Sequence, residues 1–488
     1  MSGIGLINVL LPVRMNLDGL STEVIGIVLS LYYVGLLIGA LYSTSLIKRA
    51  GHIRMFAGCV SLGAASILLC SLHSDAALWG AMRVVMGFCI ACAFTAMESW
   101  LSDSSSKETR GQVLAIYNAV VLAGLFGGQF LINVASAKDN MLFVIAGILM
   151  CIAVIPVVMS RHAGPILEEF SSMSLRLLYK RSPLGVVSCL ISGMLYSAIF
   201  NLLPVFARGV DITGFQLSLY MGAAIFGAFI LQFPVGYLSD RFDRRTVLLV
   251  MLIISASAGI GVTILASLGI IWAVFLATAI TCGIIACTYP LSISEALDRL
   301  RQSEMVSAMS SMILAFAVGG ILGPYSASLM MDKFGGSALF YFLAFIQLSL
   351  ACFVIYRMTV RSSLPIDEQE QFVMQGSVIT SAVELDPRTE YHEPQHLPRA
   401  VVKTSLMVAE ADPELAIDLC VALAKIKLGR GLAVAKALVI LPNINAVNLY
   451  QTLSNALPEH SVKLKAALMS VKPELADELA KVTPTNLS

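Results

Sequence analysis

The chain has 488 residues, of which 57% are hydrophobic and 13% are charged, and its mean hydropathy is +0.83. A soluble globular protein carries about 25% charged residues, so this chain has too little charge to cover a water-exposed surface of its size. The composition excludes a secreted domain, a soluble enzyme and a disordered chain, and it predicts an all-α protein that crosses a membrane several times.

Apolar runs that can cross ~30 Å of hydrocarbon as helices recur along most of the chain. The first apolar segment, 1–13, is too short, because a helix of that length rises only ~20 Å. We expect it to be the outer part of a first helix whose beginning is absent, with a short re-entrant N-terminus as the alternative. Eleven full spans are expected after it, at residues 24–47, 55–72, 77–100, 112–134, 140–160, 184–206, 216–238, 246–268, 270–294, 305–330 and 336–357.

Lysine and arginine gather on one side of this twelve-span design. Sixteen of them lie in the loops after even-numbered spans and just beyond the last span. Four lie in the other loops, at Arg14, Lys138, Arg208 and Lys333. Because cytoplasmic loops carry the excess of Lys and Arg, the even loops and the C-terminal tail are predicted to be cytoplasmic. The expected location is a bacterial inner membrane, with the lipid bilayer as a partner.

The longest loop between spans, 161–183, divides the membrane part into an N-terminal bundle, 1–160, and a C-terminal bundle, 184–361. Residues 362–399 are rich in Glu, Gln, Pro and Ser, which predicts a linker. A small helical cytoplasmic domain is expected at 400–488. The net charge is +5 up to residue 361 and −4 beyond it, a balance that gives no support for binding nucleic acid.

The C-terminal tail carries helix signals and an internal repeat. Asp412 followed by Pro413 predicts the start of a helix. The phrase Pro-Glu-Leu-Ala occurs at 413–416 and again at 473–476, which predicts two packed helical repeats. Because the tail has no catalytic constellation, we expect it to regulate the protein or to dock a cytoplasmic protein partner, with a merely stabilising cap as the alternative.

The two bundles repeat several sequence features. The stretch 236–245 reads Gly-Tyr-Leu-Ser-Asp-Arg-Phe-Asp-Arg-Arg, and 45–54 is a weaker version of it. Glycine-rich segments stand at 124–128 and at 319–324. Two parallel six-span repeats around a midplane cavity are a common design of secondary transporters.

These motifs resemble those of the major facilitator superfamily. Residues 236–245 nearly copy its G-x-x-x-D-R-x-G-R-R loop, with Asp243 where glycine is usual, whereas Lys48 replaces the aspartate in the first bundle. Arg83 to Gly87 resembles the R-x-x-x-G motif of span four. The resemblance implies the major facilitator fold of two six-helix bundles, and it leaves open sugars, drugs, peptides, ions and metabolites as substrates.

Two further segments resemble the YcaD-like branch of that superfamily. They are Met-Glu-Ser-Trp-Leu at 97–101 and Thr-Ser-Ala-Val-Glu-Leu-Asp-Pro-Arg at 380–388.

Arg83 is the main candidate for substrate binding, because ionisable groups inside a span are costly and commonly functional. We expect it to face the cavity, where a guanidinium binds an anionic substrate or biases a proton-carrying carboxylate. A snorkelling interfacial side chain is the alternative. The other polar residues expected in the cavity or in coupling, with bridging between helices as their alternative, are Asn118, Tyr196, Asn201, Gln232 and Tyr289.

Glu98 and Glu295 end spans four and ten on the cytoplasmic side. They are expected either to carry protons or to pair with the basic loops as an inner gate. The complete set of expected gate residues is Arg49, Glu98, Asp240, Arg241, Arg244, Arg245 and Glu295. The residues expected to allow close packing and rocking of helices are Gly124, Gly127, Gly128, Gly319, Gly320, Gly323 and Pro324.

No cofactor, metal site or enzymatic activity is expected. The chain lacks a G-x-x-x-x-G-K-[ST] loop, so it has no ATP motor of its own. His392 and His396 flank a helix-breaking Pro394, and Cys89 and Cys92 lie in a span, where core packing is the simpler role.

The sequence therefore predicts a secondary transporter of a small organic solute, coupled to protons, with a uniporter as the alternative. Export is preferred, because the Arg83 motif and the glycine-rich segment resemble those of drug-efflux members. The alternative is a membrane sensor or scaffold that acts through its tail.

Overall fold

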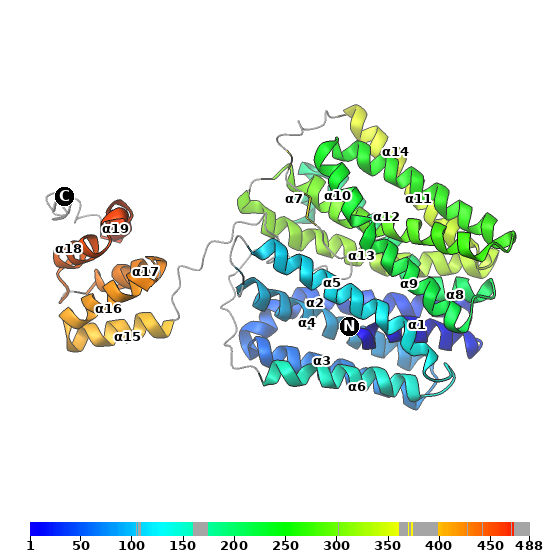
Figure 1. Ribbon diagram of the computed structural model, residues 1–488, viewed down its shortest axis with the longest axis horizontal. Helices are drawn as coiled ribbons and strands as arrows, with labels where there is room; N and C mark the ends of the chain where they lie inside the picture. The colour runs from blue at the N-terminus through cyan, green and yellow to red at the C-terminus, as the bar shows by residue number, and fades with distance from the viewer. Residues whose placement is uncertain are drawn as a thin grey trace. The chain divides into compact units, whose positions relative to one another are not determined.

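The computed structural model describes residues 1–103, 105, 109–159, 174–300, 302–360, 369, 372–373, 399–426, 428–441, 443–469 and 471–472. Across these residues all regular structure is helical (Figure 1). The chain forms two compact units, Met1–Glu390 and Tyr391–Ser488. The linker segment 374–398, which contains His392 and His396, lies outside the described residues, and so does the second Pro-Glu-Leu-Ala phrase at 473–476.

The first unit contains two halves. The helices of the first half are α1 (Ser2–Leu17), α2 (Thr22–Ala50), α3 (His52–Leu72), α4 (Ala76–Asp103), α5 (Arg110–Phe130) and α6 (Met141–Val158). A short helix, α7 (Leu175–Arg181), precedes the second half. The helices of the second half are α8 (Pro183–Gly209), α9 (Gly214–Ile230), α10 (Gln232–Arg241), α11 (Arg244–Ser267), α12 (Ile271–Leu297), α13 (Gln302–Phe334) and α14 (Ala338–Val360).

Eleven segments of the described chain are long and apolar enough to cross a membrane, which confirms the predicted number of full spans. Their ends agree with the prediction to within a few residues; the span expected at 184–206, for example, is Pro183–Gly209. The remaining apolar helix, α1, has 16 residues. The chain is therefore a multi-pass integral membrane protein.

One expected span, 216–238, is broken into two helices. α9 ends at Ile230, α10 begins at Gln232, and Leu231 is a turn between them. Pro234 lies in the first turn of α10. It has no N–H to donate and its ring clashes with a helical carbonyl four residues earlier, at Ile230, so the helix bends here.

Glycines let helices approach closely within each half. A Cβ on Gly35 of α2 would lie 1.9 Å from the carbonyl oxygen of Val84 in α4. In the second half, a Cβ on Gly319 of α13 would lie 1.9 Å from the carbonyl oxygen of Leu190 in α8. The two halves thus use the same backbone-to-backbone contact, which the predicted repeat implies.

The predicted packing glycines divide into two groups. Cβ atoms on Gly124, Gly128, Gly319, Gly320 and Gly323 would each approach a neighbouring helix to 2.5 Å or less.

Gly127 is a correction to this prediction, because a Cβ there would meet nothing within 4 Å. Successive residues are about 100° apart around a helix, so Gly127 points away from the helix face that Gly124 and Gly128 share. Pro324 lies inside α13, and a Cβ on Gly26 of α2 would come within 2.7 Å of its carbonyl oxygen.

The two ends of the first unit differ in what joins its halves. We call the end with the α2–α3 and α10–α11 turns the basic end, and the end with the α1–α2 and α8–α9 turns the opposite end. At the opposite end, Asn133 donates to Ser218 (2.7 Å), and Ser218 donates to the carbonyl of Gln129 (2.9 Å). Arg208 also donates to the carbonyl of Val13 (3.4 Å). These hydrogen bonds close the opposite end between the halves.

The second unit contains α15 (Arg399–Ala411), α16 (Pro413–Ile426), α17 (Leu428–Leu438), α18 (Ala446–Ala456) and α19 (Ser461–Met469). Asp412 accepts hydrogen bonds from the backbone N–H groups of Glu414 and Leu415, both at 3.1 Å, so α16 starts where the sequence predicts. Burial raises the pKa of the Cys420 thiol to about 12. The unit has a small apolar core of its own, which includes Leu438, Leu449, Leu453 and Leu464.

Candidate functional site

A cavity of about 80 Å³ lies between the halves of the first unit. Side chains of α1, α2, α4 and α5 line it from the first half, and side chains of α8, α9 and α13 line it from the second. One water needs about 10–15 Å³ of such volume, so the cavity has room for a small molecule. Its position between two repeats is where transporters of this design bind their substrates.

Arg83 of α4 is the charged side chain among the described residues that line this cavity. It is 2% exposed, and its guanidinium lies 4.5 Å from the centre of the Tyr32 ring. One terminal nitrogen donates to Asn201 Oδ1 (3.4 Å), and the other lies 4.0 Å from Met86 Sδ. Nε has no hydrogen-bond partner. No carboxylate in the described part of the chain forms an ion pair with this guanidinium.

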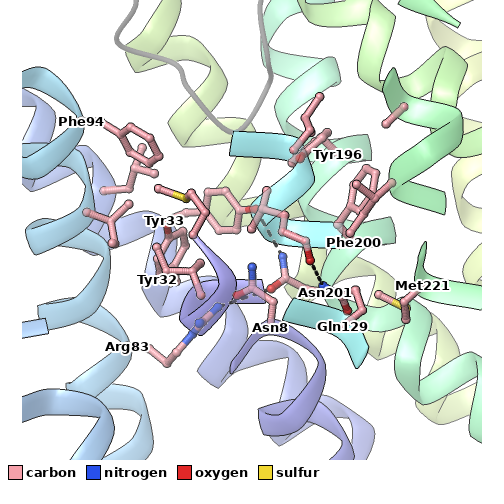
Figure 2. A pocket seen from close by; sticks show the side chains of 18 of the residues that line it. Asn8, Tyr32, Tyr33, Arg83, Phe94, Gln129, Tyr196, Phe200, Asn201 and Met221 are labelled. Carbon is pink, nitrogen blue, oxygen red and sulfur yellow. Dashed lines mark hydrogen bonds between the residues drawn. The ribbon is translucent and has the colours of Figure 1, made fainter. Parts of the chain in front are cut away.

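Asn201 of α8 joins the two halves at the cavity wall. Its Nδ2 donates to the hydroxyl of Tyr33 on α2 (3.3 Å) and to the carbonyl of Ser197 on its own helix (2.8 Å). Its Oδ1 accepts from Arg83. The Asn201 amide accepts from Arg83 through Oδ1 and donates to Tyr33 through Nδ2. Asn201 therefore fixes the positions of a guanidinium and a phenol that belong to the other half. Figure 2 shows these contacts as dashed lines.

Gln129 of α5 adds a second polar group to the cavity wall. It is 2% exposed, and its Nε2 donates to the carbonyls of Gly5 and Leu125, both at 3.1 Å. These two acceptors fix which end of the amide is the nitrogen, and Oε1 has no partner. Two side chains that line the cavity, Arg83 and Gln129, therefore each carry a buried polar atom, Nε and Oε1 respectively, with no hydrogen-bond partner among the described residues.

Aromatic rings make up much of the rest of the wall. Tyr196 and Phe200 of α8 stack with ring centres 4.5 Å apart, and Phe316 of α13 lies 6.1 Å from Tyr196. Figure 2 shows Arg83, Asn8 and Asn201 close together, with Phe94 and Tyr196 farther from Arg83. The site thus combines a polar cluster around Arg83 with several aromatic rings.

Three of the six residues predicted for the cavity line it, namely Arg83, Tyr196 and Asn201. The other three are buried elsewhere. Asn118 lies inside α5, and Gln232 donates to the Ala228 carbonyl at the α9–α10 break (3.0 Å). Tyr289 packs edge-on against Phe316 (4.8 Å), one layer behind the cavity wall. The described residues that line the cavity include one from α13 and none from α12.

Sequence reasoning missed four polar lining residues: Asn8, Tyr32, Tyr33 and Gln129. Tyr32 and Tyr33 were detectable, because two adjacent phenols in the middle of a span must each find a polar partner or an aromatic face. Asn8 lies in α1, which the sequence predicts to be only the outer part of a first helix. Gln129 stands near the end of its span, and nothing in the sequence marks it as buried.

A second, larger cavity of about 510 Å³ lies within the first half, among α3, α4, α5, α6 and the start of α1. Its wall is largely apolar, and it shares Ile4, Ile90 and Phe94 with the cavity between the halves. Tyr117 also lines it, and the Tyr117 hydroxyl donates to Glu98 Oε1 (3.3 Å). Glu98 is 1% exposed, so this carboxyl is buried behind the second cavity.

At the basic end, the second half contains a cluster of buried ion pairs. Arg245 Nε donates to Glu295 Oε1 (3.1 Å), and Arg299 Nε donates to the same oxygen (3.3 Å). Arg244 pairs with Asp298 and also donates to Ser239 (3.1 Å).

Glu295 thus pairs with Arg245 of the loop at 236–245. Pairing with a basic loop is one of the two roles that the sequence predicts for Glu295. These pairs fasten the α10–α11 turn to the end of α12.

The other predicted gate residues behave differently. Asp240 is exposed and accepts from the backbone N–H of Phe372 (2.7 Å), beyond the last span. Arg241 is exposed and lies over the ring of Tyr237 (4.3 Å). Arg49 is exposed at the end of α2. Among the described ion pairs, Asp240 therefore takes no part in the arginine cluster that the sequence led us to expect.

The equivalent turn of the first half contains a contact between His52 and Ser99. His52 Nε2 lies 3.1 Å from Ser99 Oγ, and both side chains are buried. This contact joins the α2–α3 turn to the end of α4, as Arg245 and Glu295 join the α10–α11 turn to α12.

Comparison with known proteins places this fold and site in a family. A model of the Major Facilitator Superfamily matches the chain over residues 1–301 and again over residues 186–409. The chain therefore belongs to the major facilitator superfamily, and its general function is secondary transport of a small solute.

Particular relatives agree with the predicted branch. Proteins named "Uncharacterized MFS-type transporter YcaD" from Shigella flexneri and Escherichia coli O8 are 28% identical to this chain over 354 residues. The alignment covers 70% of this chain and 88% of each relative. The predicted resemblance to the YcaD branch is confirmed.

Solved structures share the fold. The nucleoside transporter NupG aligns with a TM-score of 0.60 at 13% identity, over 74% of this chain and 96% of NupG. A bacterial homologue of the human lysosomal transporter Spinster, inward-facing and unoccupied, aligns with a TM-score of 0.56 at 14% identity. That alignment covers 79% of this chain and 94% of the homologue. At these identities the likeness establishes the architecture of two six-helix bundles and leaves the substrate open.

Proposed function

We propose that this chain is a proton-coupled secondary transporter, which carries a small organic solute by alternating access between its two halves. The observation that carries the proposal is the position of Arg83, a buried cation at the wall of the cavity between the halves. An ionisable group in the interior of a membrane bundle costs several kcal/mol and usually marks a substrate or ion pathway. A purely structural role gives no reason to keep it there.

The contacts between the halves support alternating access. Hydrogen bonds close the opposite end, whereas the ion pairs Arg245–Glu295 and Arg244–Asp298 at the basic end join helices of the second half to one another. We therefore propose that the solute exchanges through the basic end in this conformation. Transport requires the opposite end to open and the basic end to close, with α2 and α13 rocking past each other on their glycines.

Glu98 is the proposed proton carrier. Carboxylates inside membrane bundles commonly form proton relays, and Glu98 is buried next to the Tyr117 hydroxyl. Tyr117 lines the second cavity, which meets the substrate cavity at Ile90 and Phe94. This adjacency gives the proton and the solute separate but neighbouring positions.

The predicted topology gives the orientation of the two ends, and the direction of transport is proposed from motif resemblance. With sixteen Lys and Arg at the basic end, we propose that this end and the C-terminal tail are cytoplasmic. Export is the proposed direction, on the resemblance of the Arg83 and glycine-rich motifs to those of drug-efflux members.

The test is flux in proteoliposomes that contain the full chain, with and without an imposed pH gradient, against a library of metabolites and drugs. We expect at least one solute to be accumulated only when the gradient is present. Arg54→Gln, which changes an exposed arginine at the basic end, is the control for Arg83→Gln.

Deletion of residues 365–488 separates transport from the rival role as a sensor or scaffold. Gradient-driven flux that survives the deletion supports the transporter. If no solute moves with either chain, the proposal is wrong.

A further inference from the structure

The two unpaired atoms of the central cavity define a ligand. Arg83 Nε lacks an acceptor, and Gln129 Oε1 lacks a donor, although both side chains are 2% exposed. Buried polar atoms are almost always hydrogen-bonded, so each exception needs an explanation. In a cavity between two transporter repeats, the explanation is a bound molecule that supplies both partners.

The charge of the ligand follows from Arg83. The contacts to Asn201 and Tyr32 partly offset the desolvation of the guanidinium, but neither is a counter-ion. Arg83 is the charged side chain among the described lining residues, so we match it with one negative charge on the ligand. A planar carboxylate fits the guanidinium fork better than a spherical anion does.

The body of the ligand follows from the aromatic part of the wall. Tyr196, Phe200 and Phe316 line the cavity with their rings in contact. Such rings favour an aromatic ligand by offset or edge-to-face stacking. The volume of about 80 Å³ corresponds to roughly five to eight waters in this conformation, so the ligand is a small molecule.

We infer that the transported solute is a small aromatic hydroxy-monocarboxylate. Its carboxylate binds Arg83, its hydroxyl donates to Gln129 Oε1, and its ring stacks on the Tyr196 side of the cavity. The inference rests on the proposed transport function, since it describes the substrate of that same cavity.

Three probes of nearly equal size separate these contributions. Mandelate has the ring, the hydroxyl and the carboxylate; phenylacetate lacks the hydroxyl; 1-phenylethane-1,2-diol lacks the charge. Binding to the detergent-solubilised full chain is measured by calorimetry. We expect mandelate to bind about tenfold more tightly than phenylacetate and at least 30-fold more tightly than the diol, because a site built around polar groups rejects analogues that leave them unpaired.

Two variants assign the contacts. Arg83→Gln is expected to weaken mandelate binding at least 30-fold, and Arg54→Gln to leave it unchanged. Gln129→Met is expected to remove the preference for mandelate over phenylacetate, with the affinity for phenylacetate retained. If Arg83→Gln does not fold, Arg83→Lys replaces it: this variant keeps the charge and should bind mandelate about tenfold more weakly.

The outcomes are distinct. Equal binding of mandelate and the diol to the wild-type chain, or no binding of any probe at 10 mM, overturns the inference. Gradient-driven flux of a neutral solute without mandelate binding leaves the transport function standing and removes this ligand class. Binding of mandelate without any flux does the reverse.

Discussion

At the basic end, the α2–α3 turn of the first half and the α10–α11 turn of the second hold corresponding places but are fastened differently. The first is joined to α4 by the contact between His52 and Ser99. The second is joined to α12 by Arg245 with Glu295 and by Arg244 with Asp298, all of them nearly fully buried.

The difference is energetic rather than geometric. Removing one partner of a buried ion pair leaves an unpaired charge and costs about 3–5 kcal/mol, whereas a neutral hydrogen bond contributes about 1 kcal/mol. We therefore expect the ion pairs to hold the second half more firmly at this end than the His52–Ser99 contact holds the first half. We expect the first half to supply the movement when the basic end closes, and four variants test this asymmetry.

The largest effect is expected for Glu295→Ala. It leaves Arg245 and Arg299 buried around an empty position, so the second half should lose about 3–5 kcal/mol of stability. Thermal melting of the purified protein measures the loss. A melting temperature close to that of the wild type would show that solvent reaches the cluster, and that the two turns do not differ as described.

Glu98→Gln should affect transport instead of stability, although Glu98 and Glu295 end equivalent spans. The amide keeps an acceptor for the Tyr117 hydroxyl, so melting should change little. A proton carrier is lost, so gradient-driven flux should fall at least tenfold while solute exchange without a gradient continues. Unchanged coupling in proteoliposomes would remove Glu98 from the proton pathway.

Ser99→Ala is the small counterpart of Glu295→Ala in the first half. It removes one partner of His52 and should cost about 1 kcal/mol, measured by the same melting experiment. A loss as large as that of Glu295→Ala would mean that both turns are fastened equally.

The smallest net effect is expected for the double variant Arg244→Met with Asp298→Leu. Apolar residues of similar volume often replace a buried ion pair at little cost, so the double variant should lie within about 1 kcal/mol of the wild type. Each single variant should be clearly less stable than the pair. If the double variant melts as low as the singles, the hydrogen bond of Arg244 to Ser239 carries more than the pair does.

The sequence predicted the spans well, because a hydrocarbon-length apolar run needs no tertiary information. It also located Arg83 and Asn201, whose polarity is unusual inside a span. It did not distinguish Tyr289 from Tyr33, because both are tyrosines in apolar helices and only the packing decides which one reaches the cavity. Gln129 was missed for the same reason.

The arginine cluster shows another limit of sequence reasoning. From the sequence alone, Asp240 and Asp298 could both lie near Arg244, and the motif at 236–245 favoured Asp240 as its partner. In the structure Asp298 forms the pair, because the end of α12 brings its carboxylate over the turn, while Asp240 points to the backbone of Phe372. The motif identifies the residue types, but the positions of the helix ends determine which residues form ion pairs.

The hydrogen bonds at the opposite end have a consequence for genetics. The side chains of Arg208 and Ser218 in the second half donate to the backbone carbonyls of Val13 and Gln129 in the first. Ordinary substitutions remove a donor side chain but leave a carbonyl in place. A saturation scan should therefore detect this closure at Arg208, Ser218 and Asn133, whose side chains donate, and overlook it at Val13 and Gln129, whose backbone carbonyls accept.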